Sequence, residues 1–534
     1  MSTLTNSSIA LTDVGFRWPD GVTALADITG SFGVGRTGLV GSNGAGKSTL
    51  LRLIAGRLVP TTGTIDTSGD VAYLPQTLTL EQDSTIAELL GIDAKLEALR
   101  AIVSGDVDER HFEVLGDDWD IETRAGEALR EIGFTATDLD RPFGAISGGE
   151  AMLAAIAGLR LQQTPITLID EPTNNLDRDA RARLSGLVES WQGTLVVVSH
   201  DTALLDRMDE TAELYGGRLT TFGGPYSAWR EYFDQRQAAA MQAERTAEQA
   251  VRVEKRKRIE TESKLAQRTR TANKNRENRR AAKIVMNQWA SDAQVSAGKL
   301  RADLDGRVRT AQSTLDAAAV LVRDDEHIHL ELPDPGVARG RQIAELHGTT
   351  GSLVIQGPER VALTGPNGVG KTTLLEQLLE GRDGESGRAS GVLLTDRVGY
   401  LSQRLDGLDG SRSALDNVAA AAPSAPPAFL RNQLARLLLR GDTVLRPVDS
   451  LSGGERFRVA LARLLYADPP AQLLVLDEPT NNLDLGTVEQ LVDALRGYRG
   501  ALLVVSHDDA FLSRLGLTAI VELGADGRLD VSTL

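Results

Sequence analysis

Four runs along this chain consist of consecutive apolar residues without the polar alternation of a half-exposed strand. They are TLID at 167–170, TLVVV at 194–198, LLVLD at 473–477 and ALLVV at 501–505. Such runs are typical of strands that are buried on both faces of a parallel sheet. Because parallel strands are joined by helical crossovers, the pattern predicts an α/β fold.

A different pattern covers the middle of the chain. No proline occurs from Tyr226 through Leu332 and no glycine from Ser227 through Ala297, and the Ala-, Glu- and Arg-rich composition favours helix. Apolar residues recur at spacings of mostly three or four in the second half, and fewer do so in the first. These residues are Leu300, Leu304, Val308, Ala311, Leu315 and Val322, and Met241, Val251, Ile259 and Leu265. The stripes predict an antiparallel helical hairpin with its turn between about 275 and 297.

Beyond Leu265 the apolar stripe stops and a basic stretch begins. QRTRTANKNRENRRAAK at 267–283 has seven basic residues and one acid, and residues 241–310 carry 18 Lys and Arg against 9 Asp and Glu. The whole chain has a net charge of -16, so the positive charge is segregated. Arg, Asn and Lys suit phosphates and base edges, although a solvated linker has the same composition. Trp289 is expected either to stack on a base or to pack the turn.

Length and composition limit the possible classes of protein. At 534 residues the chain is long enough for two or more domains. The absence of cysteine excludes disulfides, cysteine-zinc sites and thiol nucleophiles. No run of eighteen apolar residues and no secretory signal pattern occurs, so a cytoplasmic protein without a membrane segment is expected.

Four motifs occur twice in the same order. GLVGSNGAGKSTLLRLIAG at 38–56 recurs as ALTGPNGVGKTTLLEQLLEG at 362–381, ISGGE at 146–150 as LSGGE at 451–455, LIDEPTNNLD at 168–177 as VLDEPTNNLD at 475–484, and VVVSHD at 196–201 as VVSHD at 504–508. This duplication predicts two similar domains, at 1–232 and 324–534, joined by the helical linker at 233–323.

Each copy contains a phosphate-binding loop, or P loop, of the form G-x-x-x-x-G-K-[ST]. Glycines let backbone N-H groups surround phosphates at a helix N-terminus, the lysine neutralises the terminal phosphates, and the hydroxyl of Ser48 or Thr372 is expected to reach Mg²⁺. The predicted ATP ligands are Gly41, Asn43, Gly44, Gly46, Lys47, Ser48 and Thr49 in the first copy, and Gly365, Asn367, Gly368, Gly370, Lys371, Thr372 and Thr373 in the second.

Acidic pairs follow two of the predicted strands, where ligands bind in open α/β sheets. Asp170 and Asp477 are expected to orient Mg²⁺, and Glu171 and Glu478 to polarise the water that attacks the γ-phosphate. A histidine ends another strand thirty residues after each aspartate. We expect these residues, His200 and His507, to donate to the γ-phosphate.

The SGGE motif narrows the class further. A serine and two glycines before a helical pattern predict a second anion site, formed by Ser147, Gly148 and Gly149 and by Ser452, Gly453 and Gly454. A simple P-loop ATPase does not need such a site. With it, the sequence resembles the ATP-binding-cassette (ABC) superfamily, whose cassettes pair head to tail and hydrolyse ATP.

This resemblance implies further roles. Lys47 would share a nucleotide with Ser452, and Lys371 with Ser147. Gln76 in YLPQ and Gln403 in YLSQ would sense Mg²⁺ and couple to the partner cassette, while 175–177 and 482–484 would cross the interface between cassettes.

The two predicted ATP sites are not equivalent. Trp18 precedes the first P loop and is placed to stack on adenine, whereas no Phe, Tyr or Trp occurs between Asp324 and Gly365, which leaves Arg339 or Arg341 as alternatives. The first signature also has AML where the second has RFR after SGGE. Both differences weaken the site at Lys371, so unequal sites are predicted.

Two cassettes, no membrane segment and a long charged connector resemble the ABC-F family of ribosome-associated translation factors, which includes antibiotic-resistance proteins. The resemblance implies a monomer with intramolecular cassette pairing that binds ribosomes, with residues of about 250–297 on tRNA and rRNA. The family often has histidine where Asn175 and Asn482 stand. Gln76 and Ser147 are 71 residues apart and Gln403 and Ser452 are 49 apart; the extra 22 are too few for the arm subdomain of some members.

Two other classes remain open at this point. One is the fused ATPase subunit of an ABC importer, and the other is a DNA-associated ABC ATPase whose basic linker prefers branched DNA. The sequence does not separate drug resistance from a general role in translation.

Overall fold

The uninterrupted apolar runs form the central strands of two six-stranded sheets. In the computed structural model, β6 (Ile166–Asp170) and β7 (Thr194–Val198) are buried along their whole length, as are β15 (Leu473–Asp477) and β16 (Ala501–Val505). The strand orders are β5-β6-β7-β3-β8-β9 and β14-β15-β16-β12-β17-β18, parallel except for the last strand of each sheet. The predicted α/β fold is confirmed.

The structure describes residues 8–78, 84–174, 176–277, 283–323, 332–381, 388–403, 405–481 and 483–534, without the side chains of 272–290 and 293. The chain divides into two units, Met1–Ser227 with Glu326–Leu534, and Ala228–Asp325. Among the described residues, no helix combines the length and apolarity that a membrane span requires.

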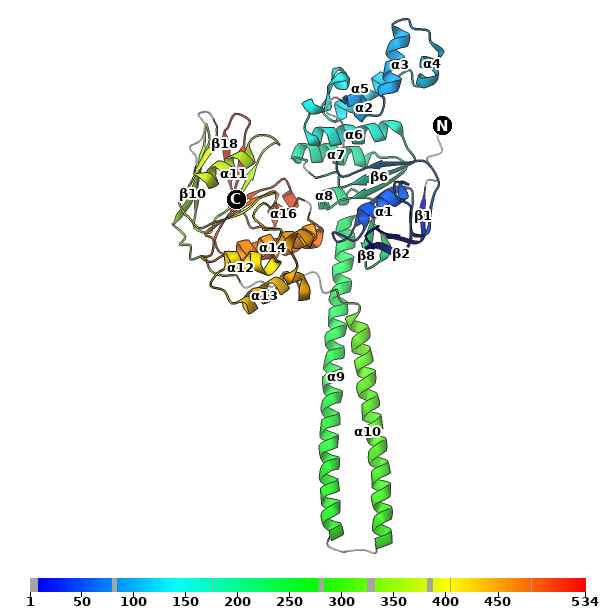
Figure 1. The fold of residues 1–534 in the computed structure, drawn as a ribbon, viewed down its shortest axis with the longest axis vertical. Coiled ribbons are helices and arrows are strands. Elements are labelled where there is room, and N and C mark those ends of the chain that lie inside the picture. Colours follow the sequence, from blue (N-terminus) through cyan, green and yellow to red (C-terminus); the bar gives the residue numbers. More distant parts are fainter. Residues whose placement is uncertain are drawn as a thin grey trace. The chain divides into compact units, whose positions relative to one another are not determined.

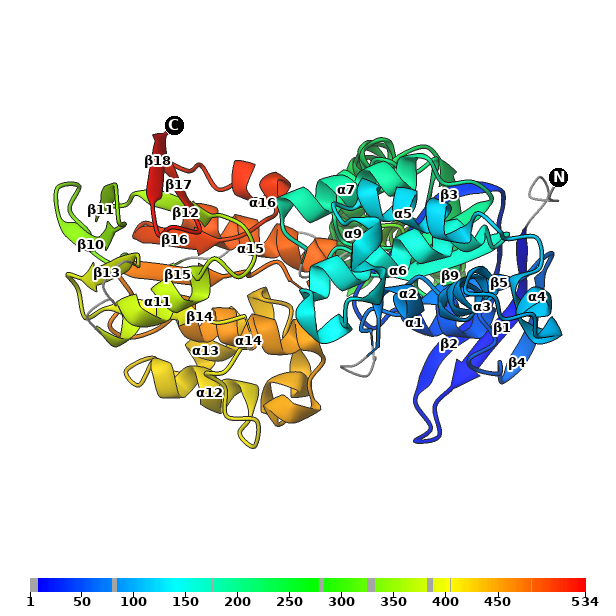
Figure 2. The ribbon, with the colours of Figure 1, turned by 90° about the horizontal axis from the view of Figure 1, so that it is seen from above.

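The first unit contains the same succession of elements twice. We call β1 to β9 with their helices the first cassette, and β10 to β18 with theirs the second cassette (Figures 1 and 2). The remaining strands of the large sheets are β3 (Gly35–Val40), β5 (Val71–Leu74), β8 (Glu210–Tyr215) and β9 (Arg218–Gly223), and β12 (Arg360–Thr364), β14 (Val398–Leu401), β17 (Ala519–Leu523) and β18 (Leu529–Thr533).

Each cassette adds a small antiparallel sheet and a set of helices. The small sheets consist of β1 (Ile9–Arg17), β2 (Thr23–Phe32) and β4 (Thr62–Thr67), and of β10 (Gln342–His347), β11 (Ser352–Gln356) and β13 (Ser390–Leu393). The helices around the sites are α1 (Lys47–Ile54), α6 (Gly148–Gln162), α7 (Arg178–Glu189) and α8 (Thr202–Leu205), and α11 (Lys371–Glu380), α14 (Gly453–Leu465), α15 (Leu485–Gly497) and α16 (Asp509–Ser513). In Figure 2 the small sheet and helices α12 to α14 occupy separate edges of the second cassette.

The large sheets are buried on both faces because alternate residues enter different cores. In β7, Leu195 and Val197 belong to the core under the helices, whereas Val196 and Val198 belong to the core shared with α1 and the small sheet. This explains why the sequence shows a continuous apolar run at these positions.

The 22 additional residues of the first cassette form two helices that the second cassette does not have. The shared helices are α2 (Ile86–Leu89) and α5 (Ile121–Glu131), and α12 (Ala414–Ala421) and α13 (Pro427–Arg436), with 3₁₀ turns η2 (Ala136–Asp140), η3 (Phe143–Ala145), η4 (Gly441–Leu445) and η5 (Val448–Ser450). The additional helices are α3 (Asp93–Val103) and α4 (Glu109–Leu115).

The second unit is the predicted helical hairpin. Helices α9 (Tyr226–Glu277) and α10 (Lys283–Ala319) lie side by side (Figure 1). They are antiparallel, because Arg258 Nε of α9 lies 2.8 Å from Asp305 Oδ1 of α10. At the other end, the buried Gln237 side chain donates to the Leu321 carbonyl at 3.3 Å and accepts from the Arg323 N-H at 2.9 Å. The connection between the helices, and most side chains of the basic stretch, lie outside the described residues.

The seam between the helices differs from the predicted stripe at two residues. Val251 and Leu304 are buried, but Ile259 is 65% and Leu300 is 41% exposed. In a heptad repeat, the position equivalent to Val251 one repeat later is Arg258, which pairs with Asp305. Ile259 lies one residue further on and turns away from α10. Including it in the stripe was wrong because a spacing of eight does not hold one face against a partner.

Candidate nucleotide-binding sites

The first P loop joins β3 to α1 and has the backbone that its glycines permit. Gly41, Gly44 and Gly46 have φ values of 156°, 83° and 96°. A Cβ at Gly41 would lie 2.5 Å from the Leu214 carbonyl oxygen, so no larger residue fits there. The loop wraps around the buried Lys47, whose Nζ donates to the carbonyls of Gly41 at 2.6 Å and Ser42 at 3.2 Å. Burial lowers the pKa of Lys47.

The second P loop repeats this arrangement with one more partner. Lys371 Nζ donates to the carbonyls of Gly365 at 2.8 Å and Pro366 at 2.9 Å, and lies 3.0 Å from His507 Nε2. Burial also lowers the pKa of Lys371. In both loops an ammonium group is therefore held where helix α1 or α11 begins, with the backbone N-H groups of that helix end beside it.

The catalytic candidates Glu171 and Glu478 follow their strands in a strained backbone conformation. Their φ values are 50° and 46°, in the left-handed region that non-glycine residues rarely adopt. Each carboxylate meets a histidine, with His200 Nε2 at 3.1 Å from Glu171 Oε1 and His507 Nε2 at 3.4 Å from Glu478 Oε1.

Burial changes the proton affinity of both acid-histidine pairs in the same way. It raises the pKa of Glu171 to about 8 and that of Glu478 to about 7. It lowers the pKa of His200 to about 3 and that of His507 to about 4. A carboxyl group with a raised pKa binds a proton more tightly than an ordinary glutamate, so its ionised form is the stronger general base for a nearby water.

The aspartates next to these glutamates fit the needs of a magnesium ion. Asp170 accepts from Ser48 Oγ at 3.0 Å and from Tyr73 Oη at 3.4 Å. Both carboxylate oxygens of Asp477 are buried, and the Thr372 side chain opposes the rise in the pKa of Asp477 that burial causes. Mg²⁺ is usually held by one or two carboxylates together with waters and substrate phosphates. Over the described parts of the chain, no cluster of three or more His, Asp or Glu offers an all-protein metal site, so phosphate oxygens would have to complete it.

Most of the predicted ligands line two cavities. The first, of about 440 Å³, is lined by Trp18, Asn43, Gly44, Gly46, Lys47, Ser48, Thr49, Gln76, Glu171 and His200 among others. The second, of about 350 Å³, is lined by Asn367, Gly368, Gly370, Lys371, Thr372, Thr373, Gln403, Asp477, Glu478 and His507 among others. Trp18 packs edge-on against Phe16, with ring centroids 4.9 Å apart. The described linings include neither Ser147 nor Ser452.

The signature serines instead begin helices. Ser147 Oγ accepts from the Glu150 N-H at 3.2 Å, while the Glu150 carboxylate accepts from the Ser147 N-H at 2.7 Å, and Ser452 with Glu455 repeats both bonds at the start of α14. This capping box explains why a glutamate follows the two glycines, since S-G-G-E has the spacing of S-x-x-E. This capping role was not predicted from the sequence.

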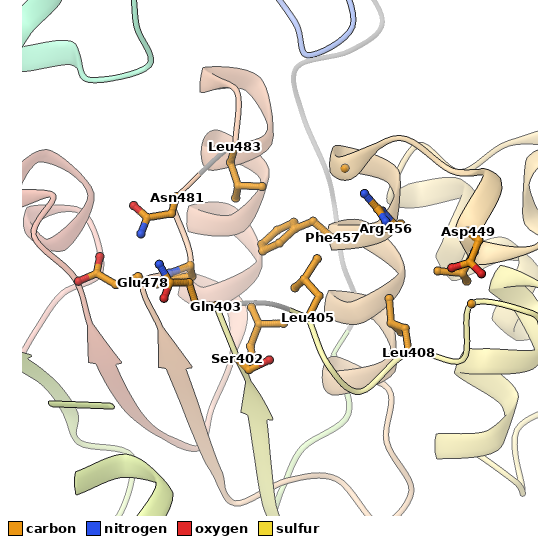
Figure 3. Close-up of a pocket in the computed structure, with 15 residues that line it drawn as sticks. Ser402, Gln403, Leu405, Leu408, Asp449, Arg456, Phe457, Glu478, Asn481 and Leu483 are labelled. Carbon is orange, nitrogen blue, oxygen red and sulfur yellow. The ribbon is translucent and has the colours of Figure 1, made fainter. Parts of the chain in front are cut away.

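A third cavity, of about 300 Å³, connects the second site to its own signature helix (Figure 3). Gln403 and Glu478 lie at one end of it and Asp449 at the other, with Phe457 and Arg456 of α14 between them. The predicted catalytic residue Glu478 and the start of α14 therefore line the same cavity. They do not complete a phosphate site within one cassette.

Asp177 and Asp484 each bond to the P loop of the other cassette. Asp484 Oδ2 accepts from the Asn43 N-H of the first P loop at 2.7 Å, and Asp177 Oδ2 accepts from the Asn367 N-H of the second at 3.2 Å. Asp177 also caps α7, and Asp484 also caps α15. The ABC resemblance implied that these segments cross between cassettes, but not that the aspartate carboxylates reach the P loops. Asn175 and Asn482 lie outside the described residues.

Comparison with known proteins identifies both cassettes. The family model described as "ABC transporter" matches residues 28–174 and 350–481. The chain is 32% identical to the tylosin resistance ATP-binding protein TlrC of Streptomyces fradiae, over 96% of this chain and 97% of that protein. It is 28% identical to ABC transporter F family member 5 of Arabidopsis thaliana, over 96% and 74% of the two chains, and 30% identical to the ATP-binding protein Uup of Escherichia coli, over 89% and 74%.

Solved structures agree on the fold. The archaeal ribosome recycling factor aABCE1, in complex with the stalk protein aP1, matches with a TM-score of 0.57 at 20% identity, over 97% of this chain and 89% of that one. Duplicated P-loop cassettes, SGGE signatures and relatives that match nearly the whole chain agree with one another. The predicted family is therefore confirmed, and the protein belongs to the ABC-F family of ATP-binding-cassette ATPases.

Proposed function

We propose that this protein binds ribosomes and uses ATP to control a basic helical hairpin that contacts tRNA and rRNA. The proposal takes residues 1–232 and 324–534 as the two ATPase domains and 233–323 as the RNA-contacting linker. It is supported by the family, by the name of TlrC as a tylosin resistance protein, and by the description of aABCE1 as a ribosome recycling factor.

In this proposal each P loop binds one ATP. Lys47 and Lys371 neutralise terminal phosphates, Glu171 and Glu478 accept the proton of the attacking water, and His200 and His507 donate to the γ-phosphate. When bound, Mg²⁺ would neutralise phosphate charge near Ser48, Gln76 and Asp170, and near Thr372, Gln403 and Asp477. Trp18 stacks on the adenine of the first site. Ser452 and Ser147, with their glycines, close on the nucleotide of the opposite cassette.

The observation that carries the proposal is the reciprocal pair of hydrogen bonds from Asn43 to Asp484 and from Asn367 to Asp177. Because each P loop is bonded to a side chain of the other cassette, a phosphate on one loop is sensed by both cassettes. ATP can drive closure only through tighter binding to the closed state, and moving a 1:99 balance to 99:1 requires about 5.5 kcal/mol. Two nucleotides held between the cassettes would together supply this difference in binding free energy.

The hairpin supports an RNA partner. Its helices pack through Val251 and Leu304, but beyond Leu265 the sequence offers mostly basic and amide side chains with little to pack on. A helix end of this kind gains little from its own hairpin, and its positive charge suits a phosphate backbone.

The test is the double variant Glu171→Gln with Glu478→Gln, which keeps the shape of both carboxyl groups but removes the base. Bound ATP should then hold the cassettes closed, so that the variant co-sediments with ribosomes in the presence of ATP and slows translation. The exposed Glu109→Gln variant is the control. Release of the double variant from ribosomes as readily as wild type would contradict the clamp.

Two further variants address the linker and the alternative classes. Arg268→Gln with Arg270→Gln should weaken ribosome binding and reduce its salt dependence, whereas Arg100→Gln, in the first cassette, should not. Co-purification with a permease instead of ribosomes would favour an importer subunit. Preference for branched DNA over ribosomes at physiological salt would favour a DNA-associated ATPase.

A further inference from the structure

An arginine of the first cassette lines the cavity of the second P loop. Arg181 and Leu176 form part of the wall of that cavity, together with Lys371, Glu478 and His507 of the second cassette. Every other described residue of this lining belongs to the second cassette. The first cassette therefore adds a cation to the space in which Lys371 is expected to hold the terminal phosphates of ATP.

Helix α7 directs Arg181 toward the second cassette. Asp177, which caps α7, accepts from the Asn367 N-H at 3.2 Å, and Arg178 pairs with the exposed Asp509 carboxylate. Residues three and four apart lie on one face of a helix, so Arg181 shares a face with Asp177 and Arg178. The two contacts hold this face of α7 against the second cassette.

Two hydrogen bonds within the first cassette fix the guanidinium of Arg181. Its Nε donates to the Leu176 carbonyl at 3.1 Å, and its Nη1 donates to Asp201 Oδ2 at 3.1 Å. The Arg181 side chain is only 18% exposed. A guanidinium has five N-H donors and stays charged in proteins. With the described residues it uses two of them, so donors remain for the oxygens of a phosphate.

The charge of Arg181 acts on the groups that it faces across the cavity. Burial raises the pKa of Glu478, and Lys371 and then Arg181 oppose that rise. Burial lowers the pKa of His507, and Lys371 and then Arg181 add to the fall. These effects agree with the position of Arg181 in the cavity wall.

The corresponding position of the second cassette carries no charge. The residue four positions after the capping aspartate is Arg181 in α7 but Val488 in α15. Val488 packs against the apolar core of its own cassette. The described residues that line the first cavity all belong to the first cassette. In the part of the chain that the structure describes, an arginine thus reaches the opposite site in one direction only.

We propose that Arg181 is a catalytic residue of the second site, supplied by the first cassette to bind the γ-phosphate of the ATP at Lys371. In this step the oxygen of water bonds to the γ-phosphorus, the bond to the β,γ-bridging oxygen breaks, and Glu478 takes a proton of the water, which leaves ADP and phosphate. Arg181 stabilises the negative charge on the phosphate oxygens during the transfer. This inference rests on the proposed binding of ATP at both P loops.

A purely structural role of Arg181 predicts damage at the opposite site. Both of its hydrogen-bond partners belong to the first cassette, where Leu176 follows Glu171 by five residues and Asp201 follows His200 directly. Loss of these bonds alone would disturb Glu171 and His200 and slow the first site. Loss of one hydrogen bond to a charged phosphate slows the second site instead, by about 10- to 100-fold.

The test measures single-turnover ATP hydrolysis by the full chain in two backgrounds. Glu171→Gln leaves Glu478 as the base and reports the second site, whereas Glu478→Gln reports the first. Arg181→Ala should slow the second site about 10- to 100-fold and change the first by less than about 2-fold. The control is Arg183→Ala, also in α7, whose guanidinium donates to the Ile132 carbonyl of its own cassette at 2.8 Å; it should leave both rates unchanged.

Binding measurements separate contact with the reacting phosphate from a displaced loop. Arg181→Ala should weaken binding of ADP with aluminium fluoride at the second site more than binding of a non-hydrolysable ATP analogue, because the first ligand resembles the phosphoryl group in transfer. Equal losses for the two ligands, or a loss of rate confined to the first site, would overturn the inference. If Arg181→Ala does not fold, Arg181→Lys is compared in the same way.

None of these measurements involves a ribosome. Failure of the wild-type protein to bind ribosomes would therefore overturn the proposed function and leave the role of Arg181 in hydrolysis standing. Failure of ATP to bind at the P loops would overturn both.

Discussion

The backbone N-H of Asn43 donates a 2.7 Å hydrogen bond to Asp484, a residue 441 positions further along the chain. The other carboxylate oxygen of Asp484 accepts from the Thr487 N-H at 2.7 Å and so caps the N-terminus of α15. One buried carboxylate therefore fixes a helix start in the second cassette and a P-loop amide in the first. The Asn43 amide, followed by the hydroxyl and the amide of Thr487, offsets the effect of burial, so the pKa of Asp484 lies below its ordinary value.

Replacing Asp484 by Ala should remove both bonds. We expect the free energy of unfolding to fall by about 1–2 kcal/mol, because a helix cap and a bond to a charged acceptor are lost together. Chemical denaturation measures this change, and hydrogen exchange reports the Asn43 amide. The Asp484→Ser variant keeps a capping hydroxyl but loses the second oxygen, so it should restore most of the stability and leave the Asn43 amide unprotected. An Asn43 amide equally protected in all three proteins would contradict the finding.

The stability of the nucleotide-free protein should fall as pH rises above about 6.5. Folded Glu171 and Glu478 keep a proton up to about 8 and about 7, whereas an ordinary glutamate releases it near 4.5. Above pH 4.5, the unfolded state thus binds fewer protons at these two glutamates than the folded state does. Their contribution to stability therefore decreases as pH rises. Below 6.5 the neutral His200 and His507, with pKa values of about 3 and about 4, oppose this trend because the unfolded state gains their protons.

Melting temperatures at pH 6.5 and 8.5 without nucleotide test this dependence. The double variant Glu171→Gln with Glu478→Gln should be more stable than wild type at pH 8.5 and should lose much less stability between the two pH values. The Glu109→Gln control should follow wild type. Equal slopes for the double variant and wild type would show that these carboxyl groups are ionised in the folded protein at neutral pH.

Ser452 caps α14 as part of a capping box, so substitutions at this residue can separate its structural role from contact with nucleotide. Ser452→Ala should lower the free energy of unfolding by about 1 kcal/mol through loss of the cap of α14. Ser452→Asp keeps the cap and should be close to wild type in stability, but its negative charge should repel a phosphate. If ATP binding at the first site is unchanged in the Asp variant, Ser452 does not face nucleotide, and only the cap remains.

The heptad seam of the hairpin predicts which apolar residues matter. Val251→Ala and Leu304→Ala remove buried side chains and should each cost about 1–3 kcal/mol of local stability, read by hydrogen exchange in α9 and α10. Ile259→Ala should cost less than about 0.5 kcal/mol, because that side chain is on the surface. Arg258→Ala breaks a half-exposed ion pair and should cost less than about 1 kcal/mol. A larger effect at Ile259 than at Val251 would contradict the seam.

Most of the fold was predictable because its signals are repeated. The apolar runs could be assigned to a doubly buried sheet, and the glycine pattern of each P loop predicts the positive φ values of Gly44 and Gly368. The helical state of α9 and α10 followed from composition, and their pairing from the two apolar stripes. The error at Ile259 arose from its spacing, because a residue eight positions after Val251 is rotated by about 80–100° around the helix from it.

The parts of the site that could not be predicted depend on distant residues. Nothing near Asp484 in the sequence indicates that its carboxylate meets Asn43. The capping box was overlooked because the same four residues also suit an anion site.

Both cassettes belong to one chain, and Asp177 and Asp484 each bond to the P loop of the other cassette. This arrangement affects how the response to ATP depends on protein concentration. Each cassette meets its partner at a fixed effective concentration, set by the chain between them and not by how many copies the cell contains. The sensitivity to ATP should therefore be the same in dilute and in concentrated protein. One copy of the chain supplies both P loops and both of the aspartates that bond to them.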